Sequence, residues 1–268
     1  MESWQPYVVT TRNVSVHAEN KIHDDVEAKR YGFKGGLVPG SALYAHMTRP
    51  VVAKFGEEWL GKNAGDLTLL KPAYEGEALR VTVDEAEGDV PLLAVAIANA
   101  EDQQLATLDT GIPETVPAPD DLHEMEPDPS TGPRTPISWD AVVVGKPMRP
   151  LIWEPTVETQ RAWCAGVSDD LSVYQGPKAP VHPGTILQAA NHILRNHFEL
   201  KPWIHVGSQI VTRGILRVGQ RIEMRAQPIE RWEKKGHQFL KMYTALTVSG
   251  EPLVEVWHSA IFSVRPSH

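Results

Sequence analysis

The residues best suited to do chemistry lie in one polar stretch, ENKIHDDVEAKRYGFKGGLVPG, which covers residues 19–40. Its only histidine is His23. The unperturbed pKa of a histidine side chain lies close to neutrality, so His23 can take up or release a proton under physiological conditions. The amide of Asn20, three residues earlier, can orient a water molecule or a substrate. These residue types are those of a general acid–base site.

The end of this loop has the features of a site for a negatively charged oxygen. Residues 38–47, VPGSALYAHM, combine Pro-Gly, a hydroxyl residue and an apolar-rich segment, which predicts the start of a helix. The unpaired N–H groups and the positive dipole end of a helix favour negative charge. A glycine allows close approach to the backbone, and two adjacent glycines allow the preceding loop to curl over a ligand. The expected substrate-binding residues are Gly36, Val38, Gly40 and Ser41.

A segment rich in proline and acidic residues divides the chain. Residues 112–138 lack apolar periodicity and cannot bury enough surface to fold independently. We therefore predict an N-terminal unit at 1–111 that carries the loop, a linker at 112–138 and a C-terminal unit at 139–268.

The two predicted units resemble each other. VPGSALYAHM at 38–47 has a counterpart in HPGTILQAAN at 182–191, and KPAYEGEALRVTV at 71–83 has one in RGILRVGQRIEMR at 213–225. A duplicated unit explains both pairs. In each unit the pattern predicts a strand, a polar loop, one helix and several long strands, which is an α+β arrangement with a sheet around a helix. The strands of the second unit are expected near 203–213, 220–232, 238–248 and 252–264, and Pro50 is expected to kink or end the first helix.

Composition narrows the range of functions. The formal net charge of −8 disfavours nucleic acid or an anionic membrane as a partner. The longest apolar run, PLLAVAIANA, is too short to span a bilayer and predicts a buried strand. We see no signal-peptide pattern at the start, so a cytoplasmic location is expected. The single cysteine, Cys164, cannot form an internal disulfide or a cysteine-based zinc site and is interpreted as a buried small residue. The histidines are irregularly spaced, so no metal is expected.

The loop resembles the MaoC-like, or type-2, enoyl-CoA hydratases and dehydratases. The residues that carry the resemblance are Asn20, Ile22, His23, Asp25, Gly32, Phe33, Gly36, Pro39 and Gly40. With the duplication, the resemblance implies a double hotdog, in which each sheet wraps a central helix and the site lies in a tunnel between the halves. It also implies reversible hydration of an acyl thioester, most simply a coenzyme A ester, without a metal or redox cofactor. Fused hotdogs often act as one pseudo-dimer, and some pair further into homo-oligomers.

The resemblance also implies roles for single residues, with one departure. His23 would be the acid–base residue, Asn20 would orient water or substrate, and the Gly40 amide would help to hold the thioester oxygen. The aspartate of the family's pattern is replaced by Ala18, and a proline by Lys21. The candidates for the missing acid are Glu19, His17, Asp24, Asp25 and a water held by Asn20. In the second unit, DDLSVY can be laid on the same pattern, which makes Asp169 a further catalytic candidate, although an ungapped overlay of the units places Asp169 elsewhere.

Three alternatives remain open at this stage. The protein can be a thioesterase on the same fold, a lyase acting on a substrate other than a coenzyme A ester, or a non-catalytic acyl-binding protein. Retention of His23 favours an enzyme, and Ala18 favours the alternatives. The arginines that recur at every fourth residue, Arg213, Arg217, Arg221 and Arg225, predict a solvated face, or otherwise a cationic rim for the phosphates of coenzyme A.

Overall fold

The computed structural model describes residues 4–86 and 92–265 of the chain. Ten strands form one antiparallel sheet in the order β1-β3-β4-β5-β2-β9-β12-β11-β10-β7. The first half of the chain supplies β1 (Tyr7–Thr10), β2 (Asn63–Leu69), β3 (Ala78–Ala86), β4 (Leu92–Ala98) and β5 (Gln104–Gly111). The second half supplies β7 (Leu151–Trp153), β9 (Ile204–Thr212), β10 (Ile222–Lys234), β11 (His237–Val248) and β12 (Glu251–Ser263). The four long strands expected in the second unit are all present within two residues of their predicted ends.

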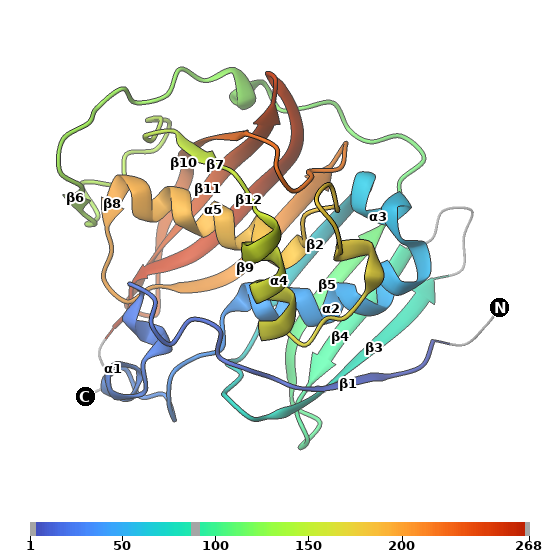
Figure 1. Ribbon diagram of the computed structural model, residues 1–268. Coiled ribbons are helices and arrows are strands. Elements are labelled where there is room, and N and C mark those ends of the chain that lie inside the picture. Colours follow the sequence, from blue (N-terminus) through green and yellow to red (C-terminus); the bar gives the residue numbers. More distant parts are fainter. Residues whose placement is uncertain (1–3, 87–91, 266–268) are drawn as a thin grey trace.

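Two long helices lie against one face of this sheet (Figure 1). They are α2 (Gly40–Phe55) and α5 (Pro183–His197), which also contact each other. The shorter helices are α1 (Asp25–Arg30), α3 (Glu57–Gly61) and α4 (Val157–Gly166), and the 3-10 turns are η1 (Lys21–His23), η2 (Asp121–Glu124) and η3 (Ser172–Tyr174). A small parallel pair joins β6 (Thr135–Pro136) to β8 (Phe198–Glu199). Among the described residues, no helix has both the length and the apolar character needed to cross a bilayer.

The two halves join at the middle of the sheet. Strand β2 of the first half pairs with β9 of the second, from Asn63 opposite Thr212 to Thr68 opposite Gly207. The repeat seen in the sequence is also visible in the backbone. Gly76 and Gly219 both adopt positive φ angles, 79° and 82°, in the turns before β3 and β10, respectively. Glycine is favoured there because other residues rarely adopt this conformation.

The sequence predicts that Pro50 kinks or ends the first helix. It does not end helix α2. The helix continues to Phe55 and ends at Gly56, whose φ angle is 56°. A proline inside a helix costs about 3 kcal/mol. Val51 and Val52, which follow it, are almost fully buried in the core, so continuing the helix recovers apolar burial of a similar size. Packing therefore outweighs the local preference.

The segment between the halves is held in place by hydrogen bonds between its backbone and side chains of the second half. The guanidinium of Arg213 donates to the carbonyls of Pro117 and Ala118 at 2.8 and 3.0 Å. The amide of Asp120 donates to the buried carboxylate of Glu255 at 2.9 Å. This segment, although rich in proline and acid, therefore follows a defined path over the strands of the second half. The predicted boundaries at residues 111 and 139 stay a prediction.

Candidate functional site

A cavity of about 250 Å³ opens where the loop at 19–40 meets the second half of the chain. The first half contributes Asn20, His23, Val38 and Gly40 to its wall. The second half contributes Asn191 from α5 and Trp203, Ile204 and His205 at the start of β9. Apolar side chains make up most of the remaining wall, so a few polar groups converge in an apolar space, as in many ligand sites.

The contacts of His23 fix which of its ring nitrogens carries the hydrogen. Nδ1 lies 2.7 Å from the carbonyl oxygen of Leu37. A carbonyl can only accept a hydrogen bond, so Nδ1 is the donor and Nε2 of the neutral ring has a free electron pair. Burial lowers the pKa of His23, and the bond to Leu37 opposes this only in part. The imidazole is therefore neutral at pH 7 and suited to accept a proton at Nε2.

Asn20 connects the His23 loop to the other half of the chain. Its Oδ1 accepts a hydrogen bond from the backbone N–H of Trp203 at 3.2 Å, and its Nδ2 donates to the carbonyl of Trp203 at 2.9 Å. The same Nδ2 lies 3.4 Å from Nε2 of His23. Most of the hydrogen-bonding capacity of Asn20 is thus used across the two halves. The structure gives it a positioning role beside His23, in addition to any contact with water or substrate.

Two acidic residues after His23 support the loop. Asp24 caps α1 by accepting hydrogen bonds from the amides of Val26 and Glu27, both at 3.0 Å. Asp25 is the first residue of α1 and does not cap it. The Oδ1 of Asp25 instead accepts from the amide of Gly36 at 2.7 Å and draws the far end of the loop towards its start.

The structure separates the four expected substrate-binding residues into two groups. Val38 and Gly40 line the cavity, whereas Gly36 and Ser41 do not. Gly36 is required for close packing, because a Cβ atom there would lie 2.2 Å from the carbonyl oxygen of His23. Ser41 is buried, and its hydroxyl has no hydrogen-bond partner among the described residues. Gly36 therefore shapes the His23 loop from outside the cavity.

None of the side chains considered as replacements for the missing aspartate reaches the cavity. Ala18 and His17 lie outside its wall. Glu19 is exposed and pairs with Arg134 at 2.7 Å and with Arg195 at 3.8 Å. Asp24 and Asp25 are used within the loop as described above. A water held near Asn20 is the one candidate of that set that the geometry still allows.

Two polar residues that the second half contributes to the wall escape the sequence analysis. Asn191 is the last residue of the repeated segment HPGTILQAAN, where the first unit has Met47. The sequence signal for Asn191 is that the second unit has an amide side chain where the first unit has an apolar one. His205 is a buried residue on β9, beside the alternating apolar positions of that strand. The sequence signal for His205 is a polar residue at a position that strand alternation directs towards the interior.

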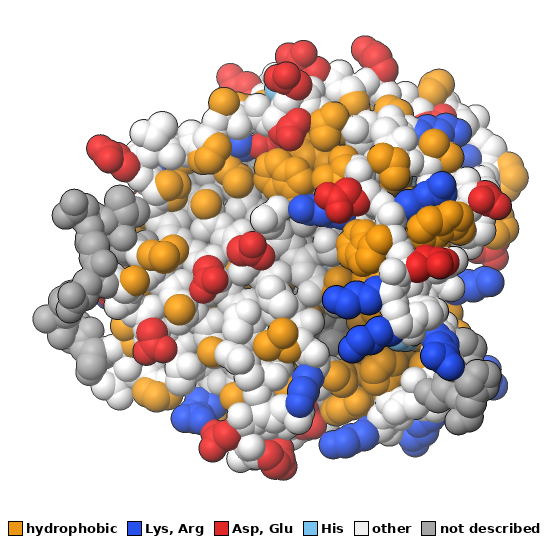
Figure 2. Space-filling model, turned by 180° about the vertical axis from the view of Figure 1, so that it is seen from behind, with side chains coloured by type: hydrophobic (Ala, Val, Ile, Leu, Met, Phe, Trp, Pro, Cys, Tyr) orange, Lys and Arg blue, Asp and Glu red, His pale blue; other side chains and the backbone are white. Residues whose placement is uncertain are grey.

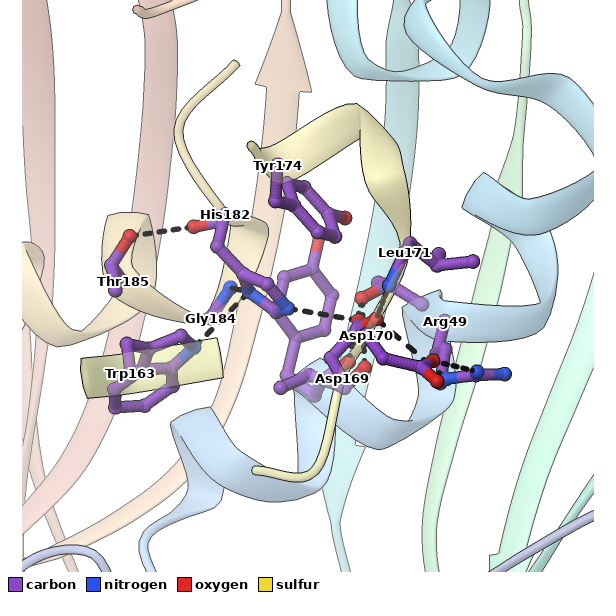
Figure 3. Close-up of polar contacts among 12 residues, drawn as sticks. Arg49, Trp163, Asp169, Asp170, Leu171, Tyr174, His182, Gly184 and Thr185 are labelled. Carbon is purple, nitrogen blue, oxygen red and sulfur yellow. Dashed lines mark hydrogen bonds and ion pairs between the residues drawn. The ribbon is translucent and has the colours of Figure 1, made fainter. Parts of the chain in front are cut away.

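Asp169 lies in a different cluster, shown in Figure 3. It follows α4, and its Oδ2 lies 3.1 Å from Nε2 of His182. His182 accepts hydrogen bonds at Nδ1 from the amide of Gly184 and from the indole of Trp163, so Nε2 carries the hydrogen and donates to Asp169. Asp169 does not line the cavity of His23. The structure therefore does not bring these two predicted catalytic residues together.

The Asp169 cluster ties the two halves through Arg49 of helix α2. The Nε of Arg49 lies 3.6 Å from Oδ1 of Asp169, and its Nη2 lies 2.6 Å from Oδ1 of the exposed Asp170. Asp169 also accepts a hydrogen bond from the amide of Leu171 at 3.1 Å. Its carboxylate is thus fully engaged by neighbours of the same chain, which indicates a structural role. Nearby, burial raises the pKa of the Cys164 thiol to about 12, so this cysteine stays protonated.

The four regularly spaced arginines form internal ion pairs. Arg213 pairs with Glu255, Arg217 with Glu57, Arg221 with Glu154 and Arg225 with Glu223. Each positive charge is thereby matched within the chain, so the arginines do not form the free cationic rim weighed as an alternative. Within residues 4–86 and 92–265, no three His, Cys, Asp or Glu side chains group in a way that would hold a metal ion.

Lysines next to the cavity residues carry unmatched positive charge instead. They are Lys21, Lys34, Lys71 and Lys201. Lys71 lines the cavity, and the other three lie within two residues of a lining residue. In the described part of the chain, none of the four forms an ion pair with a carboxylate. Figure 2 shows basic side chains gathered around an area of apolar surface at the lower right of that view.

Comparison with known proteins identifies the fold. No protein-family model matches the sequence, and no curated sequence is significantly similar to it. Solved structures do match over nearly the whole chain. A MaoC domain protein assigned as a dehydratase, from Chloroflexus aurantiacus, aligns with 99% of this chain and 96% of its own, with a TM-score of 0.71 and 12% identity. A Mycobacterium tuberculosis protein with a double hotdog fold aligns with 97% of this chain and 96% of its own, with a TM-score of 0.59 and 13% identity.

The fold is a double hotdog. The expected fold class is thus confirmed, and each half contributes five strands of the shared sheet and one long helix. Another solved structure, of a protein assigned as an oleoyl thioesterase from Lactobacillus plantarum, aligns with 98% of this chain and 96% of its own, with a TM-score of 0.56 and 11% identity. At these identities the likeness shows the fold alone, and dehydratases and thioesterases both occur among the neighbours. The site must therefore decide between activities.

Proposed function

We propose that this double hotdog is a MaoC-like hydratase or dehydratase that acts on an acyl thioester, with His23 as its acid–base residue. The observation that carries the proposal is the orientation of His23. The carbonyl of Leu37 holds Nδ1, so Nε2 is the basic atom, and the ring lines an apolar cavity formed by both halves. Asn20 fixes the loop against the second half at the same point.

The geometry supports a simple course for hydration. Nε2 of His23 takes a proton from water as the water oxygen bonds to the β-carbon of an enoyl thioester. The electron pair of the double bond moves towards the thioester oxygen, and the α-carbon then receives the proton from His23. Dehydration is the reverse. In α2 the amides of Ala42 and Leu43 bond to the carbonyl of Pro39, so the amides of Gly40 and Ser41 precede the first helical bond and can face the thioester oxygen.

The direct test of this proposal is turnover of crotonyl-CoA and longer enoyl-CoA esters, followed by loss of enoyl absorbance. The matched variant is His23→Asn, whose amide can still donate to Leu37 but lacks a basic nitrogen. We expect it to lose about 100- to 10,000-fold in kcat, the usual contribution of a general acid–base residue. Because burial lowers the pKa of His23, the acid limb of the wild-type kcat/KM profile should lie below pH 6.5.

Other results of the same assay would point elsewhere. Release of free thiol that depends on His23 would identify a thioesterase. Binding of the esters without any turnover across chain lengths would identify an acyl-binding protein. Equal turnover by His23→Asn and wild type would remove His23 from the mechanism.

The lysines at the cavity support a polyanionic carrier, which favours a coenzyme A ester over a neutral one. We expect the double variant Lys71→Glu, Lys201→Glu to raise KM for crotonyl-CoA at low ionic strength and to leave KM for the N-acetylcysteamine thioester unchanged, because the latter has no phosphates. Lys178→Glu, an exposed position in the second half, is the matched control. A similar change in KM for both substrates would show that these lysines do not recognise the carrier.

A further inference from the structure

The second half of the chain places an unusual polar atom beside the proposed thioester site. His205 on β9 lines the cavity, is 9% exposed, and has no hydrogen-bond partner at Nδ1 among the described residues. This atom faces the first residue of α2, because a Cβ atom added to Gly40 would lie 2.8 Å from it. The same Cβ would lie 2.3 Å from Cδ1 of Leu69. Gly40, Leu69 and the free nitrogen of His205 thus meet at one point.

The other ring nitrogen of His205 belongs to a buried chain of hydrogen bonds. Nε2 lies 2.9 Å from the hydroxyl of Ser208, which lies 3.0 Å from Nδ1 of His258. The two histidine rings stack with their centroids 4.0 Å apart. The serine has a single hydrogen, so the chain can run in either direction, and in one direction Ser208 donates to Nε2 and Nδ1 of His205 bears the hydrogen. Neither direction requires a charged ring.

His205 is kept neutral by its surroundings. Burial lowers its pKa to about 4, and that of His258 is lowered well below its usual range. A neutral imidazole with its hydrogen on Nδ1 is a hydrogen-bond donor that needs no counter-ion in an apolar site. Donors fixed in advance at the position where negative charge develops contribute strongly to catalysis.

We propose that His205 is a second catalytic residue, supplied by the other half of the chain, whose Nδ1–H donates a hydrogen bond to the thioester oxygen next to the Gly40 amide. This inference rests on the function proposed above. The hydrogen stays on His205 throughout, while charge moves onto the thioester oxygen and returns to the α-carbon as His23 delivers its proton. The side chain of Leu69 approaches Gly40 at the same place as Nδ1 of His205, so it must turn aside when the thioester enters.

Two substitutions of His205 separate the hydrogen bond from packing. His205→Asn keeps an N–H at the position of Nδ1, whereas His205→Leu fills the same space without a donor. We expect His205→Leu to lower kcat for crotonyl-CoA by about 100- to 1,000-fold, as for loss of one such donor, and His205→Asn to retain most of the activity. Thermal unfolding of both variants reports whether the fold is intact.

A spectroscopic measurement tests the contact itself. The carbonyl stretch of butyryl-CoA labelled with ¹³C at the thioester carbonyl should move to lower frequency on binding to wild type and His205→Asn, and move less on binding to folded His205→Leu. An equal shift and equal kcat in all three proteins would overturn the role of His205 while leaving a His23-dependent hydratase in place. Absence of butyryl-CoA binding, or of His23-dependent turnover, would overturn the proposed function and this inference with it.

Discussion

An Asp169→Ala variant should unfold with a free energy about 3–5 kcal/mol lower than wild type, the usual effect of removing one partner of a buried ion pair. The carboxylate receives the N–H of His182 at 3.1 Å and lies 3.6 Å from Arg49, and the side chain of His182 is fully buried. Without Asp169, the imidazole N–H has no acceptor and the guanidinium loses one of its two carboxylates. Because Arg49 belongs to the first half and Asp169 to the second, the loss also weakens the contact between the halves.

Urea unfolding followed by tryptophan fluorescence measures this effect. The matched control is Asp170→Ala, which removes the adjacent, exposed carboxylate that also pairs with Arg49. An exposed ion pair contributes little, so this control should unfold close to wild type. Equal destabilisation by the two substitutions would show that the buried Asp169–His182 contact contributes no more to stability than the exposed Asp170–Arg49 pair.

The protein should lose stability steeply as the pH falls from 6.5 towards 4. Burial lowers the pKa of His46, His192 and His205 to about 4, and it lowers the pKa of His258 well below its usual range. In the unfolded chain these side chains take up protons at the ordinary histidine pKa, whereas in the folded chain they remain neutral. Between the two pKa values the unfolded state binds more protons, so each such histidine removes roughly 1.4 kcal/mol of stability per pH unit. Above pH 6.5 this contribution is absent.

Urea midpoints measured at pH 7.5, 6.0 and 5.0 check this expectation. The midpoint should decrease from pH 7.5 to pH 5.0. His46→Gln is the informative variant, because it removes one buried titrating group on α2 while keeping a polar side chain near Thr11. Its midpoint should vary less with pH than that of wild type. A wild-type midpoint that stays constant from pH 7.5 to 5.0 would contradict the effect of burial on these histidines.

Sequence patterns predict the parts of this molecule that depend on local and periodic features. The duplicated Pro-Gly segments mark both central helices, and the alternating strands of the second half appear close to their expected ends. The loop with Asn20 and His23 does line a cavity, because its glycines and acids fold it locally. The catalytic roles given to these two residues stay predictions.

The remaining features depend on contacts between residues far apart in the chain, which local patterns do not contain. Asp169 contacts His182 at the start of α5 and Arg49 on α2, so its place could not be deduced from a motif overlay. Helix α2 passes Pro50 because the residues beyond it are buried. His205 enters the cavity of the first half because β2 and β9 pair at the centre of the sheet.

The covalent joining of the two halves has a consequence for ligand stoichiometry. In a dimer of identical subunits, each substitution appears in both copies, and both sites must change together. Here helix α5 is capped by His182, which bonds to Trp163 and Asp169, while the start of α2 faces the cavity of His23. The two halves are thus free to diverge, and on the function proposed above the cavity of His23, to which both halves contribute, provides one thioester site in each chain.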